Sequence, residues 1–313
     1  MKFSAAGDYL GQLRLFDYEG LKGVQDFISD TDARFVNLET TLHRGGEGIH
    51  GNTSCGGSYL FADPDILEDV KTYGFNMLSY ANNHAFDYGE NGFKSTYNAV
   101  KASGIVNAGA GMSLEEASAP DYLDTPNGRV ALIGVTASFS PDWIAGYSSK
   151  NFEGRPGVNG LRTNSKLQVK PEQFKVIKEA VENSLVNTAL NISRSEGYTP
   201  AEKEGELLVN KVLTFCEGPT EAFIQTVNET DMSRILASIK EARKNADFVL
   251  VSIHSHAVGG HSKEDVLDFM KDFCHRCIDE GADAILGHGP HIIRAMEIYK
   301  DRPVFYSLGD FML

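Results

Sequence analysis

The stretch Ala81-Asn82-Asn83-His84-Ala85-Phe86-Asp87-Tyr88-Gly89 follows an apolar run at residues 75–81 and precedes a helical pattern near residues 91–103. Amides, an imidazole and a carboxylate crowd this strand-to-helix loop, where they pack poorly but suit coordination or catalysis. In open α/β sheets, ligands collect at the carboxyl ends of the strands. The stretch therefore indicates an α/β sheet with a functional site at one edge.

Strand and helix patterns alternate on either side of this stretch. The first half of the chain has strand patterns at 3–7, 33–38, 75–81 and 105–109 and helix patterns near 21–29, 64–73 and 91–103. This rhythm predicts a mostly parallel sheet with helices outside. Asn127-Gly128 predicts a tight hairpin turn that adds antiparallel character. The later part of the chain has strand patterns at 247–253, 283–287, 292–299 and 303–308, with a helix pattern near 262–280.

Residues from about 138 to 235 break the alternation. They contain a loop-like piece at 152–160 and helical patterns near 171–193, 200–215 and 230–245. We expect one domain over residues 1–313, with this region as a helical and loop insertion that covers the cleft. The chain stops at Phe311-Met312-Leu313, directly after an apolar strand, which is typical of a domain truncated at its C-terminus.

Composition narrows the class of protein. The chain has 313 residues, 42% hydrophobic and 23% charged, with a net charge of −14. This charge disfavours binding to nucleic acid or to an anionic membrane. No stretch reaches the length of a membrane helix, and Met1-Lys2-Phe3 leads straight into the first strand pattern. A cytoplasmic location is the default expectation; the alternative is a secreted or membrane-anchored form whose leader has been trimmed.

Two acidic residues follow the first two strand patterns. Asp8 comes after Gly7, which lets the backbone turn and exposes the carboxylate; the alternative is an ordinary turn. Glu39 shares a face with Asn37 in the alternation of its strand. A carboxylate there can bridge two cations, or it can simply face solvent at a strand end.

Each polar residue of the opening stretch has an expected role. Asn83 would give its amide oxygen to a metal, and His84 would stabilise the leaving group or act as general acid. Asp87 would orient His84, or else cap the following helix. Asn82 is a candidate for substrate binding.

Four histidines follow the later strand patterns, as Ile253-His254-Ser255-His256 and Gly287-His288-Gly289-Pro290-His291. The first pair shares one face of an extended end, and the second lies in a Gly/Pro turn that can approach an ion. Asp, Asn, Glu and His without cysteine form the ligand set of a hydrolytic metal centre, with Mn, Fe and Zn equally suited. The sequence therefore predicts a metallohydrolase.

In this order, the segments resemble the calcineurin-like metallophosphoesterase superfamily, and within it the CapA-type proteins of poly-γ-glutamate capsule synthesis. The resemblance rests on the opening stretch, on Asn37-Leu38-Glu39-Thr40, on residues 281–291 and on residues 305–311. It implies a four-layer α/β/β/α sandwich with a two-metal site at one edge.

The resemblance also implies roles for single residues. Asp8 would bind the first metal, Glu39 would bridge both metals, and Asn83 would bind the second, with His84 as catalytic partner. His254 would be the ligand from the later strand, and His291 would be the last histidine. The chain departs from the pattern at Leu10 and Gly289, where the superfamily has histidines, and at Ser255-His256, where CapA-type proteins have Trp-Gly. His256 and His288 are the candidates to complete the ligand set.

The expected activity is hydrolysis of a γ-glutamyl amide bond in poly-γ-glutamate or a related acidic peptide. The alternatives are a phosphoesterase with the same metal site and a non-catalytic synthesis or assembly protein. An anionic substrate would need cationic clamps, for which Arg155, Arg162 and Arg294 are candidates by position. These arginines could instead be ordinary surface groups.

Overall fold

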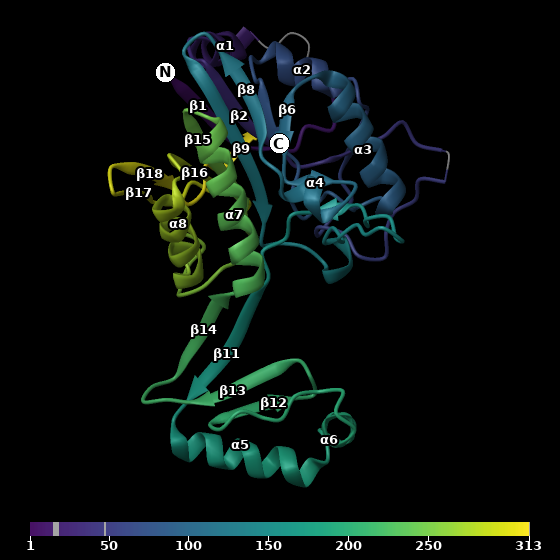
Figure 1. Cartoon of the computed structure of the whole chain (residues 1–313), viewed down its shortest axis with the longest axis vertical. Coiled ribbons are helices and arrows are strands. Elements are labelled where there is room, and N and C mark those ends of the chain that lie inside the picture. Colours follow the sequence, from purple (N-terminus) through teal and green to yellow (C-terminus); the bar gives the residue numbers. More distant parts are fainter. Residues whose placement is uncertain (15–18, 47, 313) are drawn as a thin grey trace. The chain divides into compact units, whose positions relative to one another are not determined.

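The strands predicted in the first half of the chain form one parallel sheet in the computed structural model (Figure 1). The structure describes residues 1–14, 19–46 and 48–312. The sheet order is β19-β1-β2-β5-β6. Its strands are β1 (Phe3–Tyr9), β2 (Ala33–Leu38), β5 (Met77–Ser79), β6 (Val106–Ala108) and β19 (Asp310–Met312). Each neighbouring pair is parallel, which confirms the predicted parallel sheet.

A second, six-stranded sheet has the order β17-β18-β16-β15-β9-β8. Its strands are β8 (Asp121–Thr125), β9 (Gly128–Thr136), β15 (Phe248–His254), β16 (Ala284–His288), β17 (Met296–Tyr299) and β18 (Arg302–Phe305). The hairpin predicted at Asn127-Gly128 is confirmed, because β8 and β9 pair in antiparallel register across it. The four inner strands β18, β16, β15 and β9 are parallel.

The central strand β2 is buried on both faces, as is usual for parallel strands. In β2, Phe35 belongs to an apolar cluster that also contains Leu132 of β9 and Leu250 of β15. Its neighbour Val36 belongs to the cluster that contains Phe93 of α3 (Gly89–Ser103) and residues of α2 (Ile66–Thr72). The α/β class is confirmed. The four-layer order that the resemblance implies stays a prediction.

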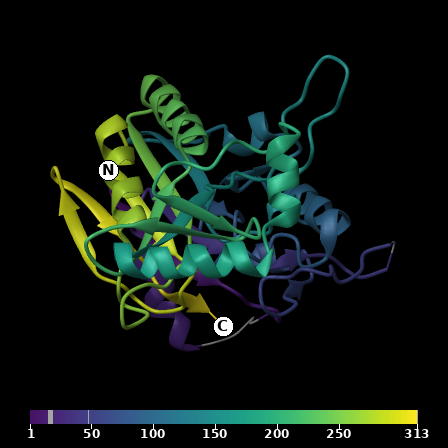
Figure 2. The same ribbon diagram turned by 90° about the horizontal axis from the view of Figure 1, so that it is seen from below.

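Helices α7 (Glu229–Asn245) and α8 (Asp268–Glu280) lie side by side (Figure 1 and Figure 2) and pack against β9, β15 and β16. The cysteines Cys274 and Cys277 of α8 are buried and free. The remaining elements of this part are η1 (Glu19–Leu21), α1 (Lys22–Ser29), β3 (Thr41–Leu42), β4 (Phe61–Ala62), β7 (Ala110–Gly111), α4 (Leu114–Ser118), η2 (Pro141–Trp143) and β10 (Gly157–Val158). Among the described residues, no helix has the length and apolar character that a bilayer span requires.

The chain divides into two compact units: unit 1 is Met1–Arg162 with Glu229–Leu313, and unit 2 is Thr163–Asn228. Leu313 lies outside the described residues. Unit 2 contains β11 (Thr163–Val169), α5 (Pro171–Ser184), α6 (Thr188–Ser195), β12 (Glu206–Val209), β13 (Leu213–Glu217) and β14 (Ala222–Val227), with sheet order β12-β13-β11-β14.

The predicted helix near 200–215 is wrong, because β12 and β13 form an antiparallel hairpin there. Asn210 and Lys211 both have positive φ and lie in the three-residue connection between the paired residues Val209 and Leu213. The compact unit is also narrower than the expected insertion, since residues 138–162 and 229–235 belong to unit 1. That the insertion covers the cleft stays a prediction.

Candidate metal centre

The parallel strands of unit 1 carry the predicted acids and histidines at their carboxyl ends. Asp8 lies near the end of β1, Glu39 follows β2, and Asn83 lies a few residues beyond β5. His254 and His288 end β15 and β16, and the register of these two strands pairs them directly. Residues far apart in the sequence are thus brought together at one edge of the two sheets.

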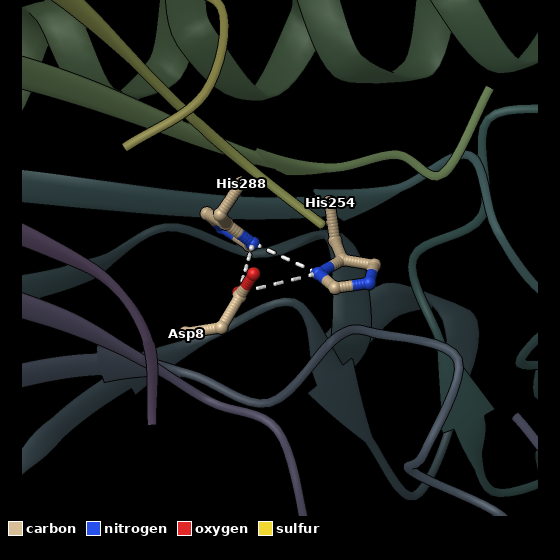
Figure 3. Close-up of side chains that lie close together, drawn as sticks. All are labelled: Asp8, His254 and His288. Atoms are coloured by element: carbon tan, nitrogen blue, oxygen red, sulfur yellow. Dashed lines mark hydrogen bonds and ion pairs between the residues drawn. The ribbon is translucent and has the colours of Figure 1, made fainter. Parts of the chain in front are cut away.

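Asp8, His254 and His288 form a buried cluster (Figure 3). Oδ1 of Asp8 lies 3.4 Å from Nδ1 of His288 and 3.7 Å from Nδ1 of His254, and the two Nδ1 atoms are 2.9 Å apart. The carboxylate also accepts hydrogen bonds from Nδ2 of Asn37 at 2.7 Å and the N–H of Gly289 at 2.9 Å. Burial raises the pKa of Asp8, but interactions with the two histidines outweigh it and hold this pKa well below its usual range. Asp8 is therefore not an ordinary turn residue.

Glu39 is fully buried, so the alternative of a solvent-facing side chain is wrong. Among the described residues, neither carboxylate oxygen has a hydrogen-bond partner. Nε2 atoms of four histidines surround Oε1: His256 at 3.5 Å, His254 at 3.6 Å, His84 at 3.8 Å and His291 at 4.0 Å. Burial, and then the charge of Asp8, raises the pKa of Glu39 well above its usual range.

These distances fit a cation between the side chains. Donor atoms that share one ion at about 2.0–2.2 Å lie about 3–4 Å from one another. A buried carboxylate without a partner is strongly unfavourable unless a positive charge compensates it. The surroundings of Glu39 therefore have both the chemistry and the spacing of a metal site.

The amide of Asn83 is held with its oxygen toward the same region. Oδ1 lies 2.6 Å from Nε2 of His254 and 3.1 Å from Nε2 of His256. Nδ2 donates to the carbonyl oxygen of Gly56 at 2.8 Å, which fixes the orientation of the amide. Asn83 thus presents a metal-ligating atom, as its expected role requires.

His84 and Asp87 form a buried pair. Nδ1 of His84 donates to Oδ2 of Asp87 at 2.6 Å, and the carboxylate also accepts from the N–H groups of Gly56 and Leu60, each at 2.8 Å. Because Nδ1 is used in this way, Nε2 is the nitrogen that faces Glu39. The alternative that Asp87 caps the next helix is wrong, because α3 has Tyr88 at its N-cap and no side-chain cap.

Burial keeps two of the histidines neutral near pH 7. Burial is the main cause that lowers the pKa of His254 to about 3 and that of His256 to about 4. For His256, the nearby charge of His291 lowers the pKa further. A neutral imidazole is the form that binds a metal ion.

Asp310 is a member of the site that the sequence left without a role. Its Oδ1 accepts a hydrogen bond from Nδ1 of His291 at 2.8 Å, and His291 Nδ1 lies 3.9 Å from Oδ2 of Asp8. Asp310 pairs with Asp8 in the register of β1 and β19. The signal was present in the sequence, because Gly309-Asp310 follows an apolar strand as Gly7-Asp8 does. A Cβ at Gly7 would overlap the carbonyl oxygen of Gly309.

Three groups of side chains among the described residues have ligand atoms close enough to hold a metal ion. They are Asp8 with His254 and His288, Glu39 with His256 and His291, and Asp8 with His291 and Asp310. Because Asp8 and His291 each belong to two groups, the groups form one connected centre.

The predicted substrate-binding residues have other contacts. Asn82 is fully buried, and its amide bonds to the carbonyl oxygen of Leu38 at 2.8 Å and to the N–H of His84 at 3.1 Å. These contacts favour positioning of the loop over contact with substrate.

The three arginines are likewise engaged in structural contacts. Arg155 donates to the carbonyl of Ile144, and Arg162 forms a two-pronged pair with Asp231. Arg294 is buried and donates to two backbone carbonyls. The position of the arginines in the sequence did not reveal these partners. Their role as clamps for an anionic substrate stays a prediction.

Comparison with known proteins places the chain in a family. The family model described as "Bacterial capsule synthesis protein PGA_cap" matches residues 12–313. The uncharacterized protein y4sH of Sinorhizobium fredii is 34% identical over 311 residues, covering 98% of this chain and 65% of that protein. The PGA biosynthesis protein CapA of Bacillus subtilis is 25% identical over 300 residues, covering 95% and 56%. A probable polyglutamine synthesis accessory protein of Mycobacterium tuberculosis is 24% identical over 282 residues, covering 90% and 55%.

The chain therefore spans less than two thirds of the length of these relatives. The family match itself extends over nearly all of the chain, from the residues just after Asp8 to the last strand. It agrees with the α/β fold and with the strand-end cluster of acids and histidines. We conclude that the chain belongs to the PGA_cap family of bacterial capsule synthesis proteins, within the metallophosphoesterase-like superfamily.

Proposed function

We propose that the protein is a metal-dependent hydrolase that cleaves a γ-glutamyl amide bond in poly-γ-glutamate or a related acidic peptide. The observation that carries the metal dependence is Glu39, a buried carboxylate with no hydrogen-bond partner among the described residues and four histidine nitrogens within 4.0 Å. The names of the CapA and polyglutamine-synthesis relatives support the class of substrate.

The donor atoms fit two divalent ions that share Glu39. One ion would be held by Oδ1 of Asn83 with Nε2 of His254 and His256, and the other by Asp8, His291 and Asp310. Carboxylate, amide and imidazole donors suit Mn, Fe and Zn, and local availability often decides among them.

His288 would position His254 rather than bind an ion. If Nε2 of His254 is a ligand, its Nδ1–H can donate to Nδ1 of His288, 2.9 Å away. Nε2–H of His288 can then donate to the hydroxyl of Ser252 at 2.7 Å. Each nitrogen of the pair has a defined role in this arrangement, which is typical of the groups that orient histidine ligands.

Bound divalent ions would polarise the amide carbonyl group under attack and acidify a water molecule toward neutral pH. His84 would donate its Nε2 proton to the leaving amine as general acid. Asp87 keeps Nδ1 of His84 engaged, so that Nε2 remains directed at the centre. Burial of Asp8, Glu39 and His254 excludes water and strengthens their electrostatic interactions.

Lys263, at the edge of the centre, would bind a carboxylate of the substrate. Nζ of Lys263 lies 3.5 Å from the carbonyl oxygen of Pro290, the residue before His291, and its charge acts on His256. The buried Arg294 fixes the loop that carries it, by donating to the carbonyls of Lys263 at 2.7 Å and Ala257 at 3.0 Å. Lys263 is therefore a further candidate clamp beside the three arginines.

The proposal is tested by metal analysis and product analysis of the purified protein. We expect about two ions per chain and release of glutamate from γ-linked oligomers, both lost in Glu39→Ala. Cleavage of an aryl phosphate without amide cleavage would instead identify a phosphoesterase. Protein that binds no Mn, Fe or Zn and shows neither activity when they are added would identify a non-catalytic assembly protein.

A further inference from the structure

A segment outside the predicted site, residues 52–60, is bonded along its length to the loop that carries Asn83 and His84. We call it the brace segment. The N–H of Asn52 donates to the carbonyl of Asp87 at 2.7 Å, and Nδ2 of Asn52 donates to the carbonyl of Phe86 at 3.3 Å. The N–H of Leu60 donates to Oδ2 of Asp87 at 2.8 Å.

Gly56 makes the most specific contacts of the brace segment. Its N–H donates to Oδ1 of Asp87 and its carbonyl oxygen accepts from Nδ2 of Asn83, each at 2.8 Å. Gly56 therefore binds both the carboxylate of Asp87, which orients His84, and the amide of Asn83, which faces the centre. Without this acceptor, the amide of Asn83 could turn its NH₂ group toward the metal site in place of its oxygen.

Gly56 also lies where no side chain fits. A Cβ at this position would lie 2.7 Å from both Nδ1 and Cε1 of His84 and 2.6 Å from the carbonyl oxygen of Asn83. All three atoms belong to the backbone or to a ring already fixed by Asp87, so none of them can move away without disturbing the centre. Any residue with a side chain would collide with these atoms, so this position requires glycine.

We propose that Gly56 is a positioning residue of the metal centre, which sets the amide of Asn83 and the ring of His84 for the ion that Asn83 would bind. The inference rests on the proposed function, because it takes Asn83 as a ligand. Residues that orient metal ligands typically change metal affinity or activity about 10–100-fold when they are replaced. The ion held by Asn83 is the one expected to depend on Gly56. In the other group of donors, Asp8 accepts hydrogen bonds from Asn37 and Gly289, and His291 bonds to Asp310, so these partners lie outside the brace segment.

The test uses metal binding as its readout. Gly56 and Asn83 both line a cavity of about 260 Å³ with His256, so activity alone would not separate positioning from substrate contact. Metal-free protein is titrated with Zn²⁺ in a calorimeter, and the absorption spectrum of the Co²⁺ form is recorded. Gly56→Ala is expected to weaken one of two binding events about 10–100-fold and to change the Co²⁺ bands.

Two further variants accompany it. Gly23→Ala in α1 is the matched control, because a Cβ there meets open space, and it should bind metal as the wild type does. Asn52→Ala keeps the contacts of Gly56 but loosens the brace segment, so we expect a smaller loss of metal affinity, about threefold. This variant provides the test if Gly56→Ala does not fold.

A folded Gly56→Ala protein with the wild-type isotherm and spectrum would overturn the role of Gly56 and leave the hydrolase proposal standing. If Gly56→Ala does not fold, a wild-type isotherm for Asn52→Ala would overturn the role of Gly56 and leave the hydrolase proposal standing. Wild-type protein that binds no metal would overturn both proposals.

Discussion

Glu39 lies at the centre of the site without a hydrogen-bond donor for either oxygen among the described residues. At the scale of single residues, the burial of Glu39 serves function at the expense of the stability of the fold. Burial of a carboxylate without a partner costs free energy that the rest of the fold must offset. A protein keeps such a residue where a ligand supplies the missing interaction, and the four surrounding histidines indicate a cation as that ligand.

Glu39→Gln removes the ionisable carboxyl group and keeps the shape of the side chain. We expect the metal-free variant to be more stable than the metal-free wild type, by about 1–3 kcal/mol. Added Zn²⁺ or Mn²⁺ should stabilise the wild type and have much less effect on the variant. Urea unfolding with a chelator or with metal measures both effects. Glu153→Gln, at an exposed position, is the control, and a destabilised metal-free Glu39→Gln would contradict this account.

Lys263→Ala tests the proposed contact with a substrate carboxylate. Loss of a charge-assisted contact should raise KM for γ-glutamyl oligomers about tenfold and leave kcat unchanged. An uncharged substrate should be cleaved equally well by variant and wild type. Lys271→Ala, an exposed lysine of α8, is the control. An unchanged KM would show that Lys263 does not bind the substrate.

Residue type and place in the chain were sufficient to predict most of the candidate centre. Asp8, Glu39, Asn83 and His254 all lie at or just beyond the carboxyl ends of apolar strands, and parallel strands bring these ends to one edge. The arginines could not be assigned in this way. Whether Arg162 is free depends on Asp231, 69 residues further along the chain, and the local sequence carries no sign of that pairing.

At the scale of elements, long apolar runs predicted the strands of unit 1, because parallel strands buried on both faces leave a continuous hydrophobic signal. Unit 2 was harder to predict. Its strands β12 and β13 are short and partly exposed, so their apolar residues fit a helical spacing as well as an alternating one. The turn at Asn210-Lys211 between them lacks the glycine that usually signals a hairpin.

Asp231 lies in the first turn of α7 and forms hydrogen bonds with Arg162, the residue before β11. It is buried and accepts hydrogen bonds from the backbone and guanidinium of Arg162 and from Arg234. Burial raises the pKa of Asp231, but these hydrogen bonds outweigh it, so the pKa is lowered. A carboxyl group with a lowered pKa stabilises the fold above its unfolded pKa of about 3.9, and this contribution is lost as the pH falls through the lower folded value.

Asp231→Asn should therefore lower the free energy of unfolding by about 2 kcal/mol at pH 7. The difference from wild type should narrow as the pH falls below about 4. Urea titrations between pH 7 and pH 3 measure it, with the exposed Asp142→Asn as control. A difference that does not change with pH would show that the charge of Asp231 is not what stabilises this junction.

At the scale of the whole molecule, unit 2 is connected to unit 1 through two neighbouring strands. Thr163 of β11 and Val227 of β14 are partners in antiparallel register, so the chain leaves and returns at adjacent points. All candidate metal ligands belong to unit 1. Unit 1 thus contains the complete candidate centre.

Replacement of Thr163–Asn228 by a short Gly-Ser linker should give a folded protein, because the linker has to span only about 5 Å between paired strands. We expect metal binding with the stoichiometry and affinity of the full chain. Calorimetric titration beside the full chain measures this, and thermal unfolding shows whether the shortened protein is folded. A folded but metal-free product would show that unit 2 contributes to the centre.

The pairing of β1 with β19 places Asp8 beside Asp310. Asp8, Glu39 and Asn83 all precede Asp310 in the chain, so they leave the ribosome before it does. A growing chain that has not yet reached Asp310 therefore presents an incomplete set of donors. The full candidate centre consequently forms only after β19 has docked against β1.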